Sequence, residues 1–290
     1  MRVLVTGGRG MLGKSLMKVL RAKGHTLFVA DLPETDIVDR ESILGCAVRC
    51  QPHAVIHCAA FTDVEKAEKE AEKAFSINAD GTENVAHAAE KVGAKFVYIS
   101  TDYVFSGAGN EPWKTEDVLA PLNEYGKSKA AGEKRAREIS SKCFIVRTAW
   151  LFGDGKNFVR SMLAAGKEKR EIKVVGDQVG SPTFTDDLSG FLSELITTEK
   201  YGIYHATNEG YCSWAEFAKE IFRQAEKYDE KYAETTVKEI SSGEYFSLAK
   251  RPKNGRLDKS GLRTAGFSML ASYQDALKRY LEREWVKSRS

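Results

Sequence analysis

The sequence predicts an α/β fold: a Rossmann-type, doubly wound parallel sheet, followed by a smaller C-terminal α/β part. Short apolar runs alternate with helical patterns through the first 150 residues, as βαβ units require. These runs are continuously apolar, which is typical of strands covered by helices on both faces. A glycine-rich turn follows the first run directly, where a strand would pass into a helix.

The first half supplies the predicted sheet. Its apolar runs predict strands at residues 2–6, 25–31, 53–60, 94–100 and 143–149. Helical patterns predict helices at residues 12–24, 41–51, 65–78 and 81–93. In the first of these helices Leu12, Leu16, Val19 and Leu20 recur at helical spacing before Gly24 ends the pattern.

The second half is less regular. Amphipathic patterns predict helices at residues 157–170 and 213–228, and short strands are expected at 171–177 and 202–208. Ser213 and Glu216 have the spacing of a capping box. We predict two domains, residues 1–150 and 151–290, with some segments of the second interleaved with the first.

Composition excludes several classes of function. The 290 residues carry a net charge of only +3 without a dense basic block, so we expect no nucleic-acid partner. No apolar run approaches the roughly 18 residues that cross a membrane. Met1 leads straight into the first strand, so we expect no signal peptide and a cytoplasmic location. The cysteines are scattered and the histidines lack ligand spacing, which predicts free thiols and no metal site.

The turn after the first strand predicts a dinucleotide site. Gly7, Gly10 and Gly13 give G-x-x-G-x-x-G between strand and helix, and Gly8 completes an overlapping G-x-G-x-x-G. Such glycines permit a tight turn and let backbone N–H groups approach a pyrophosphate. The positive end of the helix dipole then faces the anion.

Two charges give opposite indications about which dinucleotide is bound. Asp31 ends the second strand, 18 residues after Gly13, where a carboxylate can accept hydrogen bonds from ribose hydroxyls and would repel a 2′-phosphate. Arg9, inside the glycine loop, could instead pair with that phosphate. The sequence therefore leaves NADH and NADPH both open.

Tyr125 and Lys129 are four residues apart, so on a helix they lie on one face. A neighbouring ammonium favours the phenolate, so we expect Lys129 to lower the pKa of Tyr125 and to let it exchange a proton near neutral pH. Ser100 and Thr101, at the end of the fourth strand, offer a hydroxyl to orient a substrate oxygen.

With these features the sequence resembles the extended short-chain dehydrogenases/reductases that act on nucleotide sugars. It is most similar to their dTDP-4-dehydrorhamnose reductase family, and the resemblance covers nearly the whole chain. The motifs that carry it are "HCAAFTDVEKAE", "STDYVFSG", "PLNEYGKSKAAGE", "VRTAWLFG", "NFV", "DQVGSPT" and "RPKNGRLD".

The resemblance implies a role for each matching residue. Tyr125 would donate the proton, Lys129 would assist it, and Thr101 would complete the catalytic triad. Thr101, Asp102 and Trp150 would contact the substrate. Besides Tyr125 and Lys129, the implied cofactor-binding residues are Gly7, Gly10, Met11, Leu12, Gly13, Asp31, Asp36, Ile37, Ala60, Phe61 and Thr62.

Three further residues are assigned by the same resemblance. Asn78 would support the active site from a helix, and Arg251 and Asn254 are candidates for binding the nucleotide part of the substrate. Some family members bind magnesium at a dimer interface through a glutamate two residues after the third loop glycine. That position is Ser15 here, which makes magnesium doubtful, although a homodimer stays possible.

The implied reaction is the NAD(P)H-dependent reduction of the C4 keto group of dTDP-4-dehydro-β-L-rhamnose to dTDP-L-rhamnose, for polysaccharide biosynthesis. Two alternatives stay open: reduction of another nucleotide-linked 4-keto sugar, and a non-catalytic subunit resembling the regulatory partner of methionine adenosyltransferase. A nucleotide-sugar dehydratase would be expected to carry an acid immediately after the Thr-Asp pair, where this chain has Tyr103.

Overall fold

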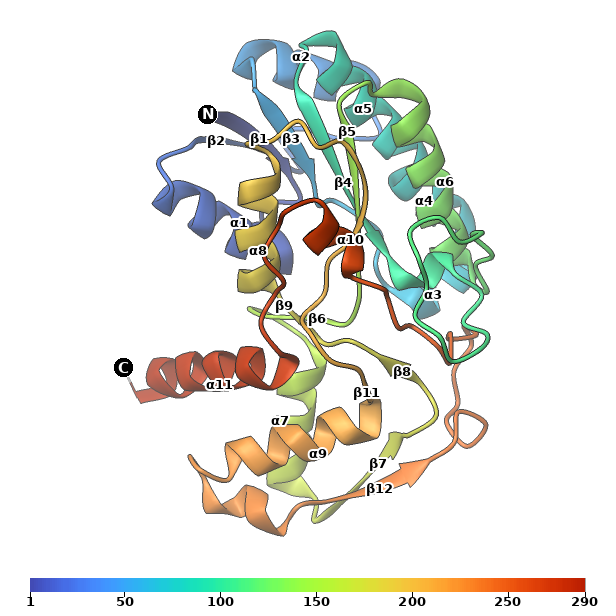
Figure 1. Cartoon of the computed structure of the whole chain (residues 1–290), viewed down its shortest axis with the longest axis vertical. Coiled ribbons are helices and arrows are strands. Elements are labelled where there is room, and N and C mark those ends of the chain that lie inside the picture. The colour runs from blue at the N-terminus through green and yellow to red at the C-terminus, as the bar shows by residue number, and fades with distance from the viewer. Residues whose placement is uncertain (290) are drawn as a thin grey trace.

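A six-stranded parallel sheet forms the centre of the molecule (Figure 1). The computed structural model describes residues 1–289, with side chains as far as residue 286. The strands of the sheet are β1 (Arg2–Thr6), β2 (Thr26–Ala30), β3 (Ala54–His57), β4 (Lys95–Thr101), β5 (Cys143–Thr148) and β10 (Gly202–His205). Their order is β10-β5-β4-β3-β1-β2, and every neighbouring pair is parallel. The predicted doubly wound sheet is therefore confirmed.

The strand order reverses between β1 and β3. After β1 the chain passes outward to β2 and then returns to β3 on the other side of β1. The loops that follow β1 and β3 consequently diverge at the carboxyl edge of the sheet. This topological switch point is where open α/β sheets bind their ligands.

Helices cover both faces of the sheet. One face packs against α1 (Met11–Ala22) and α8 (Thr185–Leu195), and the other packs against α2 (Arg40–Cys50), α5 (Gly81–Lys91) and α6 (Glu124–Ile139). In β1, Val3 and Val5 belong to the first core and Leu4 to the second, and all three are fully buried. Burying such a side chain contributes roughly 1.5–3 kcal/mol, which explains why these strands are apolar on both sides.

The helix predicted over residues 65–78 is divided into three segments: α3 (Val64–Lys69), α4 (Ala71–Phe75) and a π-helical turn, η1 (Ser76–Asp80). The break between α3 and α4 lies at Glu70, whose backbone is not helical (φ −123°, ψ 46°). Asn78, in the π-helical turn, bonds to the loop after β3. π-Turns of this kind are frequent at functional sites.

Most of the second half forms the lower part of Figure 1, whereas α10 (Ser260–Thr264) packs against β10 of the central sheet. The other elements of this half are β6 (Leu151–Phe152), α7 (Phe158–Glu168), β7 (Glu171–Val175), β8 (Val179–Gly180), β9 (Thr183–Phe184), β11 (Cys212–Ser213), α9 (Trp214–Ala225), η3 (Glu230–Glu234), β12 (Thr236–Ile240) and α11 (Tyr273–Arg289). The short helix η2 (Asp102–Val104) belongs to the first half and directly follows β4. The predicted capping box is confirmed, since the Ser213 and Glu216 side chains bond reciprocally to each other's backbone N–H.

Segments of the second half return to the first. Strand β10 pairs with β5 in the central sheet, and α8 packs on α1. The division at residue 150 into two domains stays a prediction.

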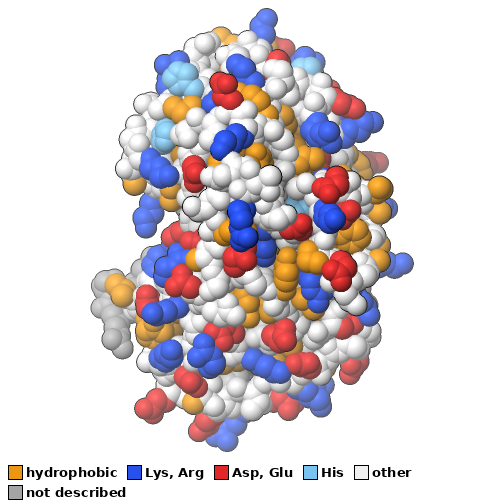
Figure 2. All heavy atoms as spheres, in the orientation of Figure 1, with side chains coloured by type: hydrophobic (Ala, Val, Ile, Leu, Met, Phe, Trp, Pro, Cys, Tyr) orange, Lys and Arg blue, Asp and Glu red, His pale blue; other side chains and the backbone are white. Residues whose placement is uncertain are grey.

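The charge distribution on the surface and the character of the helices are relevant to nucleic-acid and membrane partners. Lys and Arg side chains are interspersed with Asp and Glu over the face shown in Figure 2, without a large patch of one sign on that face. Among residues 1–289 no helix combines the length and the apolar character needed to cross a membrane. All five cysteines are free, as expected.

Candidate active site

A cavity of about 990 Å³ lies at the carboxyl ends of the parallel strands. It is lined by the loops after β1 to β5, by the start of α6 and by Trp214. The residues predicted from the sequence that line it are Gly7, Gly10, Met11, Leu12, Gly13, Asp31, Asp36, Ile37, Ala60, Thr62, Thr101, Asp102, Tyr125, Lys129 and Trp150. Among the predicted catalytic, cofactor-binding and sugar-contacting residues, Phe61 alone lies outside this lining.

The glycine loop is held by backbone contacts that leave no room for side chains. Gly7 has a φ of +68°, and a Cβ there would lie 2.5 Å from the backbone nitrogen of Ala59 in the loop after β3. A Cβ on Gly13 would lie 2.1 Å from the carbonyl oxygen of Gly7. These glycines therefore let the loop cross the switch point and let α1 pack closely on the loop.

The Asp31 carboxylate fixes this loop from the end of β2. Oδ1 accepts hydrogen bonds from the N–H groups of Gly7 (2.5 Å) and Gly8 (3.1 Å), and Oδ2 accepts one from Arg9 (2.8 Å). The position of Asp31 in the sequence predicts a contact with the ribose and gives no indication of this second role. The three N–H donors disperse its negative charge.

The N-terminus of α1 is open toward the cavity. Gly10 caps it without a side-chain hydrogen bond, and its first turn contains no acidic residue. The N–H groups of Met11, Leu12 and Gly13 have no acceptor within the helix because they belong to its first turn. Together with the glycine contacts and the size of the cavity, this cradle fits the pyrophosphate of a dinucleotide.

Asn78 supports the loop on the opposite side of the switch point. Its side chain accepts from the Phe61 N–H (2.8 Å) and donates to the Phe61 carbonyl (3.0 Å) and to the Ser128 hydroxyl (2.9 Å). Asn78 thereby ties the loop after β3 to α6. Phe61 contributes to the site through its backbone position, although its residue lies outside the cavity lining.

Helix α6 brings the predicted pair to the cavity. The Asn123 side chain caps its N-terminus by accepting from the Gly126 N–H (2.8 Å), which places Tyr125 and Lys129 in the first two turns. A Cβ on Gly126 would lie 2.2 Å from the Tyr103 carbonyl oxygen, so the helix starts very close to the end of β4. Tyr125 thereby comes within hydrogen-bonding reach of the Thr101 hydroxyl.

The expected effect of Lys129 on Tyr125 is wrong in this structure. Burial raises the pKa of Tyr125 above its ordinary value, and the hydrogen bond from Thr101 offsets this only in part. Burial also lowers the pKa of Lys129 to about 7, against the attraction of Glu133. The Lys129 Nζ lies 4.1 Å from the centre of the Tyr98 ring, a cation–π contact. Because Tyr125 and Lys129 are both buried, the cost of removing their charged forms from water outweighs the attraction between those forms.

Asp102 is a second buried group that titrates near neutrality. Its Oδ1 accepts from the Thr101 hydroxyl (3.1 Å), whereas its Oδ2 has no hydrogen-bond partner. Burial raises the pKa of Asp102 to about 7. Oδ2 faces Gly255 in the loop after β12, where a Cβ would lie 2.5 Å from it, so this oxygen is buried against that loop although Asp102 lines the cavity.

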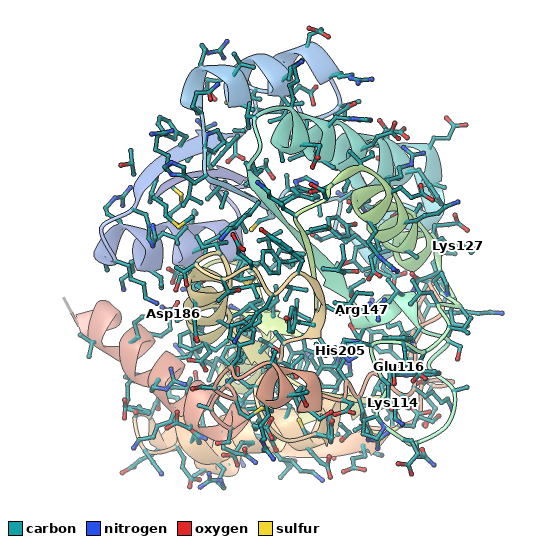
Figure 3. All side chains as sticks on the ribbon, turned by 45° about the horizontal axis from the view of Figure 1, so that its top comes forward. Lys114, Glu116, Lys127, Arg147, Asp186 and His205 are labelled. Carbon is teal, nitrogen blue, oxygen red and sulfur yellow. The ribbon has the colours of Figure 1, made fainter. Side chains whose placement is uncertain are left out.

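A buried ion pair that was not predicted from the sequence lies beneath the site. Glu133 and Arg147 form a bidentate pair (2.9 and 2.7 Å), and the Ser100 hydroxyl donates to the same carboxylate (2.5 Å). The guanidinium also lies 3.3 Å from His205 Nε2, and Figure 3 shows both side chains in the middle of the molecule. The available signal was the arginine inside the apolar strand "CFIVRTA", since a buried charge requires a partner.

Two indole rings form one wall of the cavity. Trp150 and Trp214 stack with ring centroids 3.5 Å apart and planes within 10°. Trp150 has a φ of +49°, which is a strained conformation for an aromatic residue. Its ring lies so close to Gly180 that a Cβ on this glycine would be 2.8 Å from the ring. Trp214 was not predicted as a site residue, because its sequence position indicates only the first residue of a helix.

The two candidates for nucleotide binding are engaged within the protein. Asn254 is buried and donates to the carbonyls of Ala108 and Glu111. Arg251 donates to Glu65 (2.9 Å) and lies 3.4 Å from the Tyr103 hydroxyl. Both support the loop that follows β12, and neither lines the cavity.

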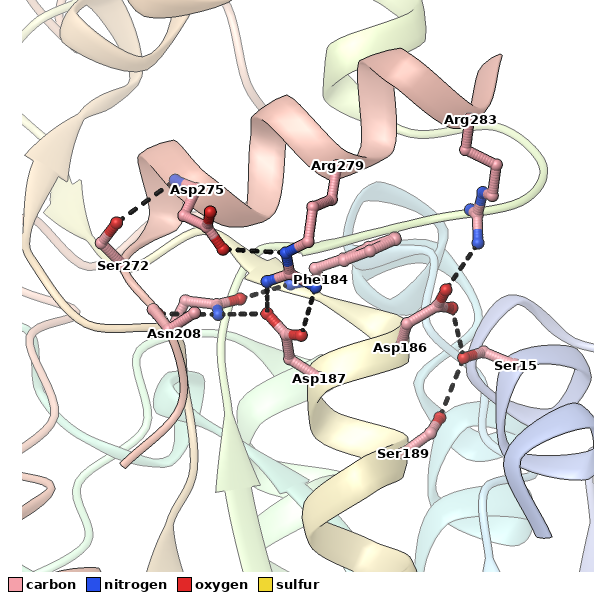
Figure 4. Close-up of polar contacts among 11 residues, drawn as sticks. Ser15, Phe184, Asp186, Asp187, Ser189, Asn208, Ser272, Asp275, Arg279 and Arg283 are labelled. Carbon is pink, nitrogen blue, oxygen red and sulfur yellow. Dashed lines mark hydrogen bonds and ion pairs between the residues drawn. The ribbon is translucent and has the colours of Figure 1, made fainter. Parts of the chain in front are cut away.

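Ser15 is part of a polar junction between α1, α8 and α11 (Figure 4). Its hydroxyl donates to Asp186 (2.6 Å) and accepts from Ser189 (3.0 Å), while Arg283 pairs with the other oxygen of Asp186 (2.7 Å). Arg279 neutralises the neighbouring Asp187 in the same way (2.8 Å). Residues 1–289 contain no cluster of three or more His, Cys, Asp or Glu suited to a metal.

Comparison with known proteins places the chain in a family. The family described as "RmlD substrate binding domain" matches residues 1–285. The chain is 38% identical to a dTDP-4-dehydrorhamnose reductase of Aggregatibacter actinomycetemcomitans, over 96% of this chain and 97% of that protein. Two solved structures of dTDP-4-dehydrorhamnose reductases are also similar. One is from Clostridium acetobutylicum (39% identity, TM-score 0.93), and the other is from Bacillus anthracis in complex with NADP (43% identity, TM-score 0.91). Each match covers 97% of this chain and 99% of the other chain. The chain therefore belongs to the dTDP-4-dehydrorhamnose reductase family.

Proposed function

We propose that the protein reduces the C4 keto group of dTDP-4-dehydro-β-L-rhamnose with NADPH or NADH and releases dTDP-L-rhamnose. The observation that carries the proposal is one cavity that joins an anion cradle at α1 to Thr101, Tyr125 and Lys129. The reduced nicotinamide supplies the hydride. The protein supplies position, a proton and electrostatic stabilisation.

The residue roles form part of the proposal. Tyr125 donates its phenolic proton to the carbonyl oxygen as negative charge develops there. Thr101 hydrogen-bonds the same oxygen, and such preorganised donors stabilise charge where it forms. The buried Lys129 ammonium, close to Tyr125 on the same helix face, stabilises the phenolate that remains. The high pKa of Tyr125 keeps it protonated, as an acid must be before it reacts.

The substrate side of the cavity is the wall formed by Asp102, Trp150 and Trp214. We infer that the sugar packs against an indole face, where apolar C–H groups and aromatic rings are both desolvated. The Asp102 carboxyl, which lines the cavity at the end of β4, would accept a hydrogen bond from a sugar hydroxyl. Because the required dinucleotides are cytoplasmic metabolites, the enzyme is expected to act in that compartment. The possible homodimer stays a prediction.

A substrate panel tests the proposal. Oxidation of NADPH and NADH would be followed with dTDP-4-dehydro-β-L-rhamnose, with the same keto sugar on other nucleotides, and with other 4-keto sugars on dTDP. The highest kcat/KM is expected for the rhamnose precursor. A higher value for another sugar would reassign the substrate, and cofactor binding without turnover of any sugar would favour a regulatory subunit.

A further inference from the structure

An exposed ion pair lies at the end of β2, at the edge of the cavity. Arg9 donates through Nη1 to the Leu32 carbonyl (2.5 Å) and through Nη2 to the Glu34 carboxylate (3.1 and 3.3 Å). The two side chains are 61% and 65% exposed. Arg9 lines the cavity and Glu34 does not, so the carboxylate holds the guanidinium from outside.

Two other acidic residues of the loop that follows β2 are engaged elsewhere. Asp31 accepts hydrogen bonds from three loop N–H groups, which disperse its charge. Asp36 lines the cavity and accepts from the Val38 N–H (2.9 Å). Glu34 is therefore the acidic side chain in direct contact with the Arg9 guanidinium.

We propose that Glu34 is a specificity-determining residue, which weakens selection for a 2′-phosphorylated dinucleotide by competing for Arg9. The proposal rests on the dinucleotide site of the proposed function. In Rossmann-type folds the adenosine ribose lies at the end of the second strand, and a nearby arginine accommodates a 2′-phosphate. A guanidinium binds phosphate and carboxylate with the same fork of donors. A 2′-phosphate must therefore displace Glu34, whereas a 2′-hydroxyl need not.

In this arrangement Asp31 affects the binding of both dinucleotides alike. Its carboxylate holds the glycine loop, which both dinucleotides need. Loss of that carboxylate should weaken both kinds of ligand together. Loss of Glu34 should strengthen only the ligand with the 2′-phosphate. Because exposed ion pairs are weak, the selective effect of Glu34 should be about 1.5- to fivefold.

Binding of adenosine 2′,5′-bisphosphate and of adenosine 5′-monophosphate, measured by calorimetry, tests the proposal without turnover. The two probes differ only by the 2′-phosphate. Glu34→Gln should raise the preference for the bisphosphate about 1.5- to fivefold. Arg9→Met should reduce that preference, and in the Arg9→Met background Glu34→Gln should have no further effect. Glu138→Gln is the matched control, since Glu138 is similarly exposed (60%) and paired with Lys134 on α6.

Three results would overturn the role of Glu34: an unchanged preference in Glu34→Gln, the same change in Glu138→Gln, or a full effect that persists without Arg9. Asp31→Asn should weaken both probes by a similar factor, and a selective gain for the bisphosphate there would return the role to Asp31. Parallel titration of the wild type with NAD⁺ and NADP⁺ separates this proposal from the proposed function. If the wild type binds neither dinucleotide, the dinucleotide site itself is refuted. If the wild type binds them but Glu34→Gln leaves the preference for the bisphosphate unchanged, only the role of Glu34 is refuted.

Discussion

The hydroxyl groups of Ser100 and Thr101, adjacent at the end of β4, have different partners. Ser100 donates to the buried Glu133 carboxylate at 2.5 Å. Thr101 donates to Asp102 at 3.1 Å and lies within hydrogen-bonding reach of Tyr125. Consecutive residues of a strand point to opposite faces, so one hydroxyl serves the structure and its neighbour faces the reaction.

Substitution of these two hydroxyls should affect turnover differently. Thr101→Val should lower kcat by about 10²–10³, as expected when one donor to a developing oxyanion is removed, and should also cost stability because it deletes the bonds to Asp102 and to the Tyr103 N–H. Ser100→Ala should destabilise the fold by about 1–3 kcal/mol, because it deletes a buried hydrogen bond to a charged group, and should change kcat by less than about tenfold. Urea unfolding and steady-state kinetics on both variants check this. A larger fall in kcat for Ser100→Ala than for Thr101→Val would contradict the geometry.

Removal of the phenolic proton should abolish most turnover. Tyr125→Phe keeps the ring and its edge contact with Tyr103, and kcat should fall about 10²–10⁴-fold while dinucleotide binding stays near normal. Tyr103→Phe is the matched control, because its hydroxyl contacts Arg251 instead of Thr101. Comparable turnover in the two variants would remove Tyr125 from the role of acid.

Lys129 should reduce stability in a pH-dependent way. Its folded pKa is about 7, below its ordinary value of 10.5, so the unfolded chain binds a proton that the folded chain releases between these values. The contribution of Lys129 to stability therefore rises with pH across that range, and the cost of burying the ammonium is full below pH 7.

Lys129→Met should consequently raise the free energy of unfolding by about 1 kcal/mol or more at pH 6, with a smaller gain at pH 9, while activity is lost. Lys127→Met, which removes an exposed lysine on the same helix, should change stability by less than about 0.5 kcal/mol at either pH. Urea unfolding at both pH values provides the comparison. A loss of stability that does not depend on pH would show that Lys129 is not buried at a cost.

The ion pair beneath the site should behave as a unit. Arg147→Met leaves Glu133 charged and buried, so it should destabilise by about 3–5 kcal/mol. The double variant Glu133→Leu/Arg147→Met should be more stable than Arg147→Met alone, since no unpaired charge remains. A thermodynamic cycle from urea unfolding measures the coupling. Additive losses in the double variant would contradict the pairing of these residues.

The features that depend on the spacing of residues close together in the chain were predictable from the sequence. The strand that precedes Gly7, the helix that follows it and the spacing of Tyr125 and Lys129 all follow from repeats of a few residues. The order of the strands then brings these segments to one cavity. The motif resemblance supplied the substrate-side residues, and Asp102 and Trp150 lie on its wall.

The missed features depend on tertiary contacts. The π-helical turn at Asn78 accompanies side-chain bonds to Phe61, a residue in another segment of the chain. The pKa of Tyr125 was predicted in the wrong direction because sequence spacing reports neighbours and not burial. Trp214 reaches the cavity only because α9 packs beneath Trp150. None of these relationships produces a local pattern in the sequence.

The most direct test of the central claim is to follow the hydride. The wild-type protein would be incubated with dTDP-4-dehydro-β-L-rhamnose and with NADPH deuterated at the transferable position, and the nucleotide sugar would be examined by NMR. The account predicts dTDP-L-rhamnose with deuterium at C4 of the sugar, formed in equal amount to the NADPH oxidised, and little product from Tyr125→Phe. Deuterium at another carbon, or NADPH oxidation without dTDP-L-rhamnose, would contradict it.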